Sequence, residues 1–155
     1  MSNLPLIVEI EKMHEDVVVP EYKHDGDAGM DIRAYLPNKE RISIFPGARA
    51  LIPTGIKVSI PEGFEIQVRP RSGLAIKNGI TVLNTPGTID SGYRGEIGVV
   101  LQNATSDVEG AFCVEHGDRV AQIVLCPVNK VQWEVVNELS GSTRSEGGFG
   151  STGEK

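Results

Sequence analysis

Three polar side chains close together in the middle of the chain could recognise and cut a small planar substrate. Asn84 carries an amide that both donates and accepts hydrogen bonds, which suits the edge of a heterocycle. Asp90 is expected at or near a loop tip between Pro86-Gly87 and Ser91-Gly92, where two strands would hold a catalytic acid in place. Taken alone, the stretch fits better an ordinary hairpin with a solvated Asp90 and a packed Tyr93, so its weight depends on its surroundings.

A second group of residues has the chemistry of an anion site. Residues 69–73 read RPRSG and precede a predicted helix over residues 72–77 that Asn78-Gly79 would stop. Helix N–H groups, the forked Arg71 donor and a close backbone approach at Gly73 would suit phosphate oxygens. By itself the segment fits equally an N-capping Ser72 with solvated arginines, which is the more common arrangement.

Two further polar positions lie on predicted strands. Asp31 could orient an arginine or bind the outer shell of a metal, or it could be an exposed residue paired with a lysine. Gln122 could donate to an oxyanion, or it could face solvent from the outer side of a sheet. The three histidines lack metal-ligand spacing, and no P-loop, nucleophile elbow or dinucleotide fingerprint is present.

The last residues, 140–155, are rich in Gly and Ser and bury too little apolar surface to offset their ordering entropy, so we expect a mobile tail. A frayed terminus is the default interpretation of such a segment. Arg144 and Phe149 are unusual in a plain solubilising tail, and the glycines beside Phe149, including Gly150, permit close approach to a ligand. We therefore predict a core of residues 1–140 and a flexible tail of residues 141–155 that closes over a bound molecule.

The elements that must position these residues are predicted to be short strands. Alternation with period two recurs between Pro- and Gly-containing turns, which indicates an all-β sandwich, barrel or jelly roll with one short helix. The predicted strands cover residues 30–36, 41–44, 56–60, 64–68, 96–101, 112–114, 120–127 and 131–136, with a further apolar strand beginning at residue 81.

Composition restricts the class of protein. The chain has 155 residues, 39% hydrophobic and 23% charged, which suits one globular domain. A net charge of -6 argues against a broad nucleic-acid or anionic-membrane surface, and we expect neither partner. Cys113 and Cys126 make no disulfide framework, and no leader or membrane-spanning run is seen, so we expect a cytoplasmic protein.

Taken together, five segments resemble the five ordered motifs of the trimeric dUTP diphosphatases, the dUTPase family. They read AGMDIRA, RPRSGLAIKNGI, GTIDSGYRGEIGV, GDRVAQIVL and RSEGGFGSTG, at residues 28–34, 69–80, 87–99, 117–125 and 144–153. The motifs occur in the family's order and span nearly the whole chain.

The resemblance implies a jelly-roll-like β subunit of the dUTPase β-clip type, assembled as a threefold homotrimer whose active sites are shared between subunits. The implied reaction is hydrolysis of dUTP to dUMP and pyrophosphate by attack of water at the α-phosphorus. It would limit uracil incorporation into DNA and supply dUMP for thymidylate synthesis. The implied cofactor is Mg²⁺, carried by the triphosphate with no direct protein ligand, although Asp31 could contact it through water.

Residue roles carried over from the family fall into catalytic and substrate-binding groups. Asp90 corresponds to the carboxylate that activates the water, while Arg71 and Asp31 support catalysis. Tyr93 corresponds to the residue that stacks on the deoxyribose and excludes a 2′-hydroxyl. The substrate-binding positions include the remaining phosphate, uracil and tail contacts: Ser72, Gly73, Asn84, Gly87, Ile89, Gly98, Gln122, Arg144, Phe149, Gly150, Ser151 and Thr152.

Elementary chemistry agrees with these roles, because attack on a phosphorus among negative oxygens needs positioning, charge neutralisation and a base. Three other hypotheses stay open at this point. The related dCTP deaminases share the fold and some motifs but lack the glycine-rich, Phe-containing tail. A catalytically silent nucleotide-binding relative would not need Asp90, and a structural β-sandwich module would leave Arg71, Asp90 and Phe149 unconstrained.

Overall fold

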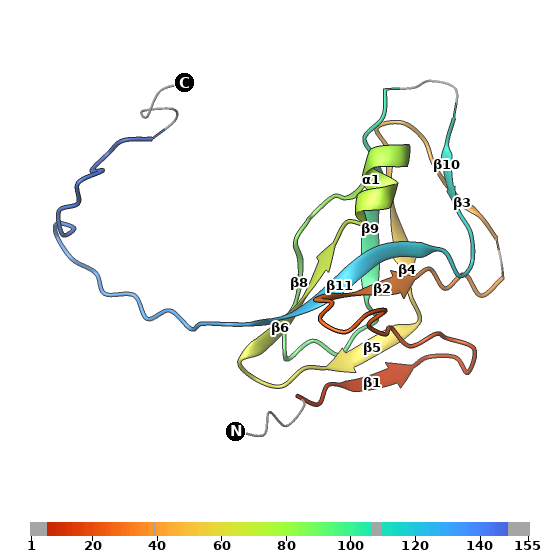
Figure 1. Ribbon diagram of the computed structural model, residues 1–155, viewed down its shortest axis with the longest axis horizontal. Helices are drawn as coiled ribbons and strands as arrows, with labels where there is room; N and C mark the ends of the chain where they lie inside the picture. Colours follow the sequence, from red (N-terminus) through yellow and green to blue (C-terminus); the bar gives the residue numbers. More distant parts are fainter. Residues whose placement is uncertain (1–5, 39, 107–109, 149–155) are drawn as a thin grey trace.

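The computed structural model describes residues 6–38, 40–106 and 110–148, and every structural statement below refers to these residues. They form short antiparallel strands and one helix (Figure 1). No helix among them is long and apolar enough to cross a membrane. The strands are β1 (Glu9–Lys12), β2 (Gly29–Arg33), β3 (Ile42–Ile44), β4 (Arg49–Pro53), β5 (Ile56–Ser59), β6 (Phe64–Arg69), β7 (Ile80–Val82), β8 (Gly87–Ile89), β9 (Gly98–Asn103), β10 (Phe112–Val114) and β11 (Arg119–Pro127), and the helix is α1 (Ser72–Asn78).

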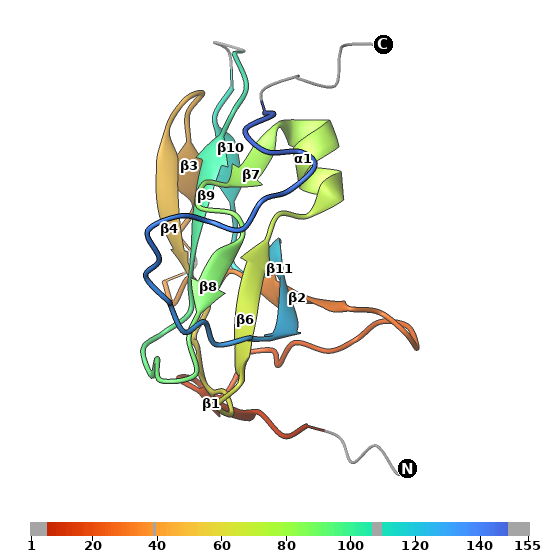
Figure 2. The same ribbon diagram turned by 90° about the vertical axis from the view of Figure 1, so that its left-hand side faces the viewer.

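Two larger sheets organise the molecule. The first has the strand order β2-β11-β6-β8, and the second has the order β4-β9-β7. Two-stranded sheets, β1-β5 and β10-β3, complete the described part of the chain, and every pairing is antiparallel. Figure 2 shows β8 and β6 side by side with opposite directions, and β6 runs toward α1, which follows it.

The core lies between the sheets and is filled by alternate residues of each strand. In β5 the buried residues are Ile56 and Val58, and in β9 they are Val99, Leu101 and Asn103. This alternation is what a half-buried antiparallel sheet requires, because successive side chains point to opposite faces. β-branched residues dominate the core, as expected for strands that must pack tightly.

The helix confirms the prediction for residues 72–77 and extends it by one residue. Its last residue is Asn78, and Gly79 caps the end of the helix. Gly79 adopts φ 62° and donates its N–H to the carbonyl oxygen of Ala75. A glycine suits this left-handed position because a Cβ there is unfavourable. The N-cap is Arg71 in an extended conformation without a side-chain cap, so the alternative of an N-capping Ser72 is wrong.

Most of the predicted strands are confirmed, but the strand predicted over residues 131–136 is wrong. Regular structure ends with β11 at Pro127, and the chain continues as an extended arm that Figure 1 shows leaving both sheets. Val131, Trp133 and Val135 alternate as a strand would, yet they are 67%, 87% and 98% exposed. No described strand lies beside the arm to accept its backbone hydrogen bonds, and an unpaired strand is not stable in water.

Three strands escaped prediction. The shortest, β8, has three residues and begins at Gly87, where the sequence predicts a turn. β1 has the sequence EIEK and is exposed throughout, so it offers no buried face to detect. β4 has the sequence RALIP, in which consecutive apolar residues hide the alternation that only the structure reveals. The all-β class with one short helix is nevertheless confirmed.

Candidate active site

Asp31 holds two arginines beside the start of the helix. Its Oδ1 accepts a hydrogen bond from Arg71 Nε at 2.8 Å, and its Oδ2 accepts one from Arg119 NH1 at 3.2 Å. The Arg71 and Asp31 side chains are only 24% and 32% exposed, so this pair is better shielded than a surface ion pair. Of the interpretations open for Asp31, orientation of an arginine is the one observed.

Gln122 ties the central strand to the segment that carries Arg71. It lies opposite Asp31 in the β2–β11 register, and its Nε2 donates to the carbonyl oxygen of Pro70 at 2.9 Å. A side chain at Gly29 would collide with the Gln122 amide oxygen, so a glycine is needed to let Gln122 take this position. The result is a fixed backbone path into Arg71 and the first turn of α1.

The first turn of the helix has room beside it. Ser72 and Gly73 begin α1, and a Cβ placed on Gly73 would meet no atom within 4 Å. Packing within the described residues therefore does not require a glycine at this position. The open space fits the prediction that another molecule approaches the backbone at Gly73.

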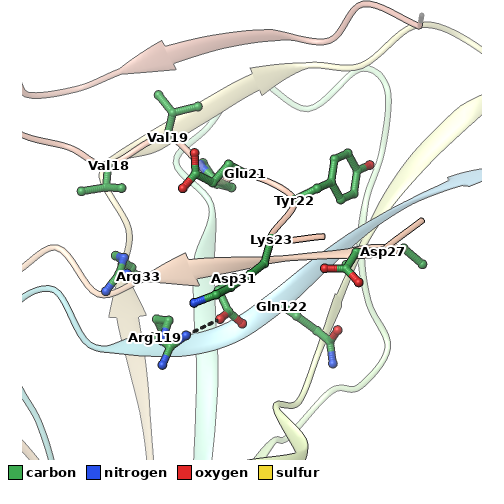
Figure 3. A pocket seen from close by; sticks show the side chains of 13 residues that line it. Val18, Val19, Glu21, Tyr22, Lys23, Asp27, Asp31, Arg33, Arg119 and Gln122 are labelled. Carbon is green, nitrogen blue, oxygen red and sulfur yellow. Dashed lines mark hydrogen bonds and ion pairs between the residues drawn. The ribbon is translucent and has the colours of Figure 1, made fainter. Parts of the chain in front are cut away.

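A cavity of about 700 Å³ lies against Asp31 and Gln122 (Figure 3). The strands β2 and β11 form one wall, and the segment before β2 forms another. Three cationic residues line it, Lys23, Arg33 and Arg119, and Figure 3 shows the ion pair between Arg119 and Asp31. Three carboxylates, that of Asp31 among them, line the cavity as well, so charges of both signs balance there. Its two arginines are the groups suited to phosphate oxygens.

A second, smaller cavity of about 180 Å³ contains Asp90 and Tyr93. Asp90 is exposed and directly follows β8, whereas the preceding Ile89 is buried and fixes the end of that strand. Gly98 begins β9 and lines the same cavity. The prediction that Asp90 lies on a loop between two strands is confirmed, although β8 and β9 belong to different sheets.

Hydrogen bonds within the loop set the position of the Tyr93 ring. The Tyr93 hydroxyl donates to the carbonyl oxygen of Glu96 at 2.9 Å, and the Tyr93 N–H donates to the carbonyl oxygen of Asp90 at 3.0 Å. The ring is 46% exposed, so one part of it packs on the loop and another part is available for stacking. Asp90 and Tyr93 are thereby held as one unit.

Asn84 and Gly87 lie together in the connection between β7 and β8. Asn84 is exposed, and a Cβ on Gly87 would stand 3.2 Å from its Nδ2 atom. The absence of a side chain at Gly87 therefore leaves space for the amide. Leu83 donates its N–H to the carbonyl oxygen of Val100, which anchors the segment to β9.

The two cavities occupy different places along β6. In the sheet register, Gln122 lies opposite Arg69, and Ile89 lies opposite Ile66 on the other side of the strand. Three residues of a strand span about 10 Å, and the β11 and β8 partners are separated by about a further 10 Å across β6. The two cavities share no lining residue, so within one chain Asp90 is not adjacent to the Asp31–Arg71 pair.

The predicted tail residues are not brought to either cavity. Arg144 lies on the arm and donates from Nε to the carbonyl oxygen of Gly147 at 2.8 Å. The described arm runs away from the sheets (Figure 1). Four predicted site residues lie outside the described residues: Phe149, Gly150, Ser151 and Thr152.

Among the described residues, the site offers contact with a metal ion through water at Asp31 and no cluster of direct side-chain ligands. Residues 6–38, 40–106 and 110–148 contain no group of three or more His, Cys, Asp or Glu side chains that could hold an ion. Each Asp31 oxygen accepts one arginine N–H and has a further lone pair for a water molecule. The donors present therefore fit a hydrated Mg²⁺ carried by a ligand, since Mg²⁺ usually retains several waters.

Three functional candidates were not found from the sequence. Arg119 is the second cation on Asp31, and only the antiparallel register of β2 and β11 brings it there. Glu96 and Thr54 connect the Asp90 loop to the turn between β4 and β5. Contacts over such sequence separations leave no local pattern by which they could have been recognised.

Comparison with known proteins gives a consistent result. The family model described as dUTPase matches residues 15–153. A deoxyuridine 5'-triphosphate nucleotidohydrolase of Alkaliphilus metalliredigens is 55% identical over 96% of this chain and 98% of its own length. Another protein of that name, from Maricaulis maris, is 48% identical over the full length of both chains.

Solved structures extend the similarity to the fold. A mutant dUTPase of Staphylococcus bacteriophage 80alpha with dUpNHpp superposes with a TM-score of 0.84 at 29% identity, covering 95% of this chain and 98% of that one. A mutant dUTPase of phage phi11 of S. aureus, described with a structural Mg(II) ion, gives a TM-score of 0.73 at 26% identity, covering 85% and 97%. The jelly-roll β-clip class is thus confirmed, and this chain belongs to the dUTPase family.

Proposed function

We propose that the protein hydrolyses dUTP to dUMP and pyrophosphate by attack of water at the α-phosphorus. The observation that carries this function is full-length membership of the dUTPase family, with Asp90 and Tyr93 together in one cavity. In a cell this reaction limits uracil incorporation into DNA and supplies dUMP for thymidylate synthesis. Deamination of dCTP and silent nucleotide binding are not favoured by these relatives.

Asp90 would act as the base that orients and deprotonates the attacking water. It is an exposed carboxylate at the end of a rigid strand, and its cavity is the size of a small ligand fragment. An ionised aspartate is a weak base, so most of the rate acceleration has to come from positioning and from charge stabilisation on the phosphates.

Arg71, with Ser72, Gly73 and Gln122, would bind the phosphate chain. Support comes from the Asp31 carboxylate, which holds the Arg71 guanidinium, and from the open space beside Gly73. The same carboxylate stabilises Arg119 next to the large cavity. Preorganised cations of this kind stabilise the negative charge that develops on the departing pyrophosphate.

The base and the sugar would be recognised at the smaller cavity. The backbone near Gly98 and, from outside the cavity lining, Asn84 and Gly87 would contact the uracil edge, while the Tyr93 ring would lie against the deoxyribose. The buried Ile89 side chain forms an apolar part of the lining of this cavity. A ribose hydroxyl would then compete with the Tyr93 ring for space, which would select the deoxynucleotide.

Mg²⁺ is the proposed cofactor, bound mainly by the triphosphate and held by Asp31 through water. When bound, it neutralises charge on the phosphates. A site formed only by protein side chains is not proposed, because the described residues contain no suitable cluster.

We further propose a threefold homotrimer in which each site uses more than one chain. Two observations support it. The cavity lined by Asp31 and Arg119 is separate from the Asp90 cavity within one chain, and the arm exposes Val131, Trp133, Val135 and Leu139. Another copy could supply the missing half of the site and cover the arm. The core would comprise residues 1–140, and the tail of residues 141–155 would bring Arg144, Phe149, Gly150, Ser151 and Thr152 over the bound nucleotide.

Hydrolysis in water enriched in oxygen-18 tests the reaction and its site of attack. We expect dUTP to give dUMP and pyrophosphate, with one labelled oxygen in dUMP, because the new bond forms at the α-phosphorus. Label in pyrophosphate would contradict attack at that atom. Release of ammonia from dCTP would indicate a deaminase, and nucleotide binding without products would indicate a silent relative.

A further inference from the structure

Glu96 connects the loop that carries Asp90 and Tyr93 to the turn between β4 and β5. Its Oε1 atom accepts hydrogen bonds from the backbone N–H groups of Thr54, at 3.1 Å, and Gly55, at 2.8 Å. Both donors lie in the turn between β4 and β5. A carboxylate that accepts two N–H groups makes charge-assisted bonds, which are stronger than bonds between neutral groups.

A side chain of the turn also donates a hydrogen bond to the backbone at the end of the loop. The hydroxyl of Thr54, which is 2% exposed, donates to the carbonyl oxygen of Ile97 at 2.6 Å. The N–H of Ile97 in turn donates to the carbonyl oxygen of Ile56 at 2.8 Å. The end of the loop is thus fixed to the beginning of β5 by side-chain and backbone bonds together.

The other side-chain hydrogen bonds of the loop remain within it. The Tyr93 hydroxyl donates to the carbonyl oxygen of Glu96, and Arg94 NH1 donates to the carbonyl oxygens of Ser91 and Tyr93 at 2.6 and 2.9 Å. These bonds give the loop an internal shape but do not position it on the protein. In the described part of the chain, Glu96 is the side chain through which the loop bonds to another element.

Packing makes the position of the Tyr93 ring depend on the backbone at Glu96. A Cβ on Gly95 would collide with the Tyr93 hydroxyl and ring, so the ring lies directly on the backbone next to Glu96. Glu96 also lines the cavity that contains Asp90 and Tyr93. A shift of Glu96 would therefore move the surface that faces the sugar.

We propose that Glu96 is a positioning residue. By anchoring the loop to Thr54 and Gly55, it would set the position of the Tyr93 ring and the orientation of the Asp90 carboxylate. The proposal rests on the proposed dUTP hydrolysis and adds a residue that determines both rate and sugar selectivity. Glu96 itself does not touch the reacting atoms in this assignment. Its effect is transmitted through the backbone of residues 90–97.

The test compares Glu96→Ala with Glu96→Gln, which retains an oxygen acceptor for the same two N–H groups. For Glu96→Ala we expect kcat on dUTP to fall about 10- to 100-fold, since misplacement by about 1 Å can cost a factor of this size. We also expect the ratio of kcat/KM for dUTP over UTP to fall about 10-fold, because the Tyr93 ring would no longer be held against the sugar. Glu96→Gln should recover most of both losses.

Asn103→Ala is the matched control for lost stability. Asn103 lies at the other end of β9, is 2% exposed, and makes hydrogen bonds to the Ile44 carbonyl oxygen and to Thr105. Its removal should lower the melting temperature at least as much as Glu96→Ala, while the dUTP/UTP ratio stays at the wild-type value. Activities are compared at a temperature at which all variants are folded.

Binding of dUpNHpp and its ribose counterpart provides a readout independent of turnover. The preference for the deoxy analogue should decrease in Glu96→Ala and be retained in Asn103→Ala. An unchanged preference and an unchanged dUTP/UTP ratio in folded Glu96→Ala would overturn the positioning role. Absence of dUTP hydrolysis by the wild-type protein would instead refute the proposed function, so the two failures are distinguishable.

Discussion

At the scale of single residues, the function depends on the environment that each polar side chain receives. Asp31 occupies a strand position that is often solvated, but it forms ion pairs with two arginines, which it would hold in place for the proposed phosphate contacts. Asp90 makes no such ion pair in the described structure and stays exposed at a strand end. Two aspartates of one chain are thus suited to different tasks, one to support and the other to contact the reacting water.

Replacement of the proposed base tests this division directly. Asp90→Asn should retain the melting temperature and dUTP binding, while kcat falls on the order of 100-fold or more, because a positioned base is lost. Glu9→Gln, an exposed change on β1, is the control and should leave kcat unchanged. Near-wild-type turnover by Asp90→Asn would show that another group activates the water.

A different aspartate, Asp16, should make the stability of the fold depend on pH. The Tyr35 hydroxyl donates to Asp16 Oδ1 at 2.9 Å, and this bond lowers the pKa of Asp16 below its ordinary value of 3.8. Desolvation, followed by Asp16 itself, raises the pKa of Tyr35 above 10.0. The neutral phenol and ionised carboxylate are therefore the favoured pair in the folded protein.

The sign of each shift gives a pH window for this pair. A lowered aspartate pKa contributes stability above pH 3.8 that is lost as the pH falls through the folded value, and a raised tyrosine pKa contributes stability below pH 10.0 that is lost above it. Tyr35→Phe should thus destabilise the protein most between these limits. Urea unfolding at several pH values measures the difference, and a deficit that does not shrink at either extreme would contradict the role of the bond.

At the scale of elements, strands with a clear alternation of buried residues could be predicted from the sequence, whereas very short strands and strands defined by their partners could not. β5 and β9 alternate because one face meets the core, whereas β1 is exposed and exists through its pairing with β5. Residues 131–136 alternate equally well but have no described partner strand. An alternation with period two shows which face of a strand would be buried. It does not identify the neighbouring strand, because pairing depends on distant residues.

The candidate site divides in the same way. Asp90, Tyr93, Arg71 and Gln122 could be proposed from motifs that lie within short segments. The Arg119–Asp31 ion pair and the Glu96 contacts with Thr54 and Gly55 join residues far apart in the sequence, so only the folded chain reveals them.

The arm and tail should contribute to activity much more than to the stability of the core. Among the described residues, deletion from Thr143 onward removes only a segment without a helix or strand, so the melting temperature should stay nearly unchanged. Activity on dUTP should fall sharply, since Arg144 and Phe149 could no longer close the site. Calorimetry and steady-state kinetics on the same preparation test both parts, and full activity would make the tail dispensable.

At the scale of the whole molecule, the proposed trimer would explain why the two groups of site residues are separate within one chain. The Asp31–Arg71 pair and the Asp90 loop would meet across subunits, and the exposed arm would lie against a neighbour. In that assembly the fold would also direct complementary parts of the site toward different surfaces of one chain.

Mixed oligomers test the shared site. Asp90→Asn and the deletion from Thr143 are each expected to be inactive, and they are unfolded and refolded together in equal amounts. If Asp90 and the tail of one site come from different chains, roughly a quarter of the sites regain both elements in a closed ring. If mixing is verified and activity nevertheless remains at background, both elements must come from the same chain.

The most direct test of the central claim is pyrophosphate release from dUTP compared with dCTP, dTTP and UTP, using the full chain with Mg²⁺. We predict rapid release from dUTP and a kcat/KM lower by at least about 100-fold for each of the others, because the proposed site would bind the uracil edge and leave no room for a 2′-hydroxyl. Comparable release from all four nucleotides, or none from dUTP, would contradict the assignment of this protein as a dUTP-specific hydrolase.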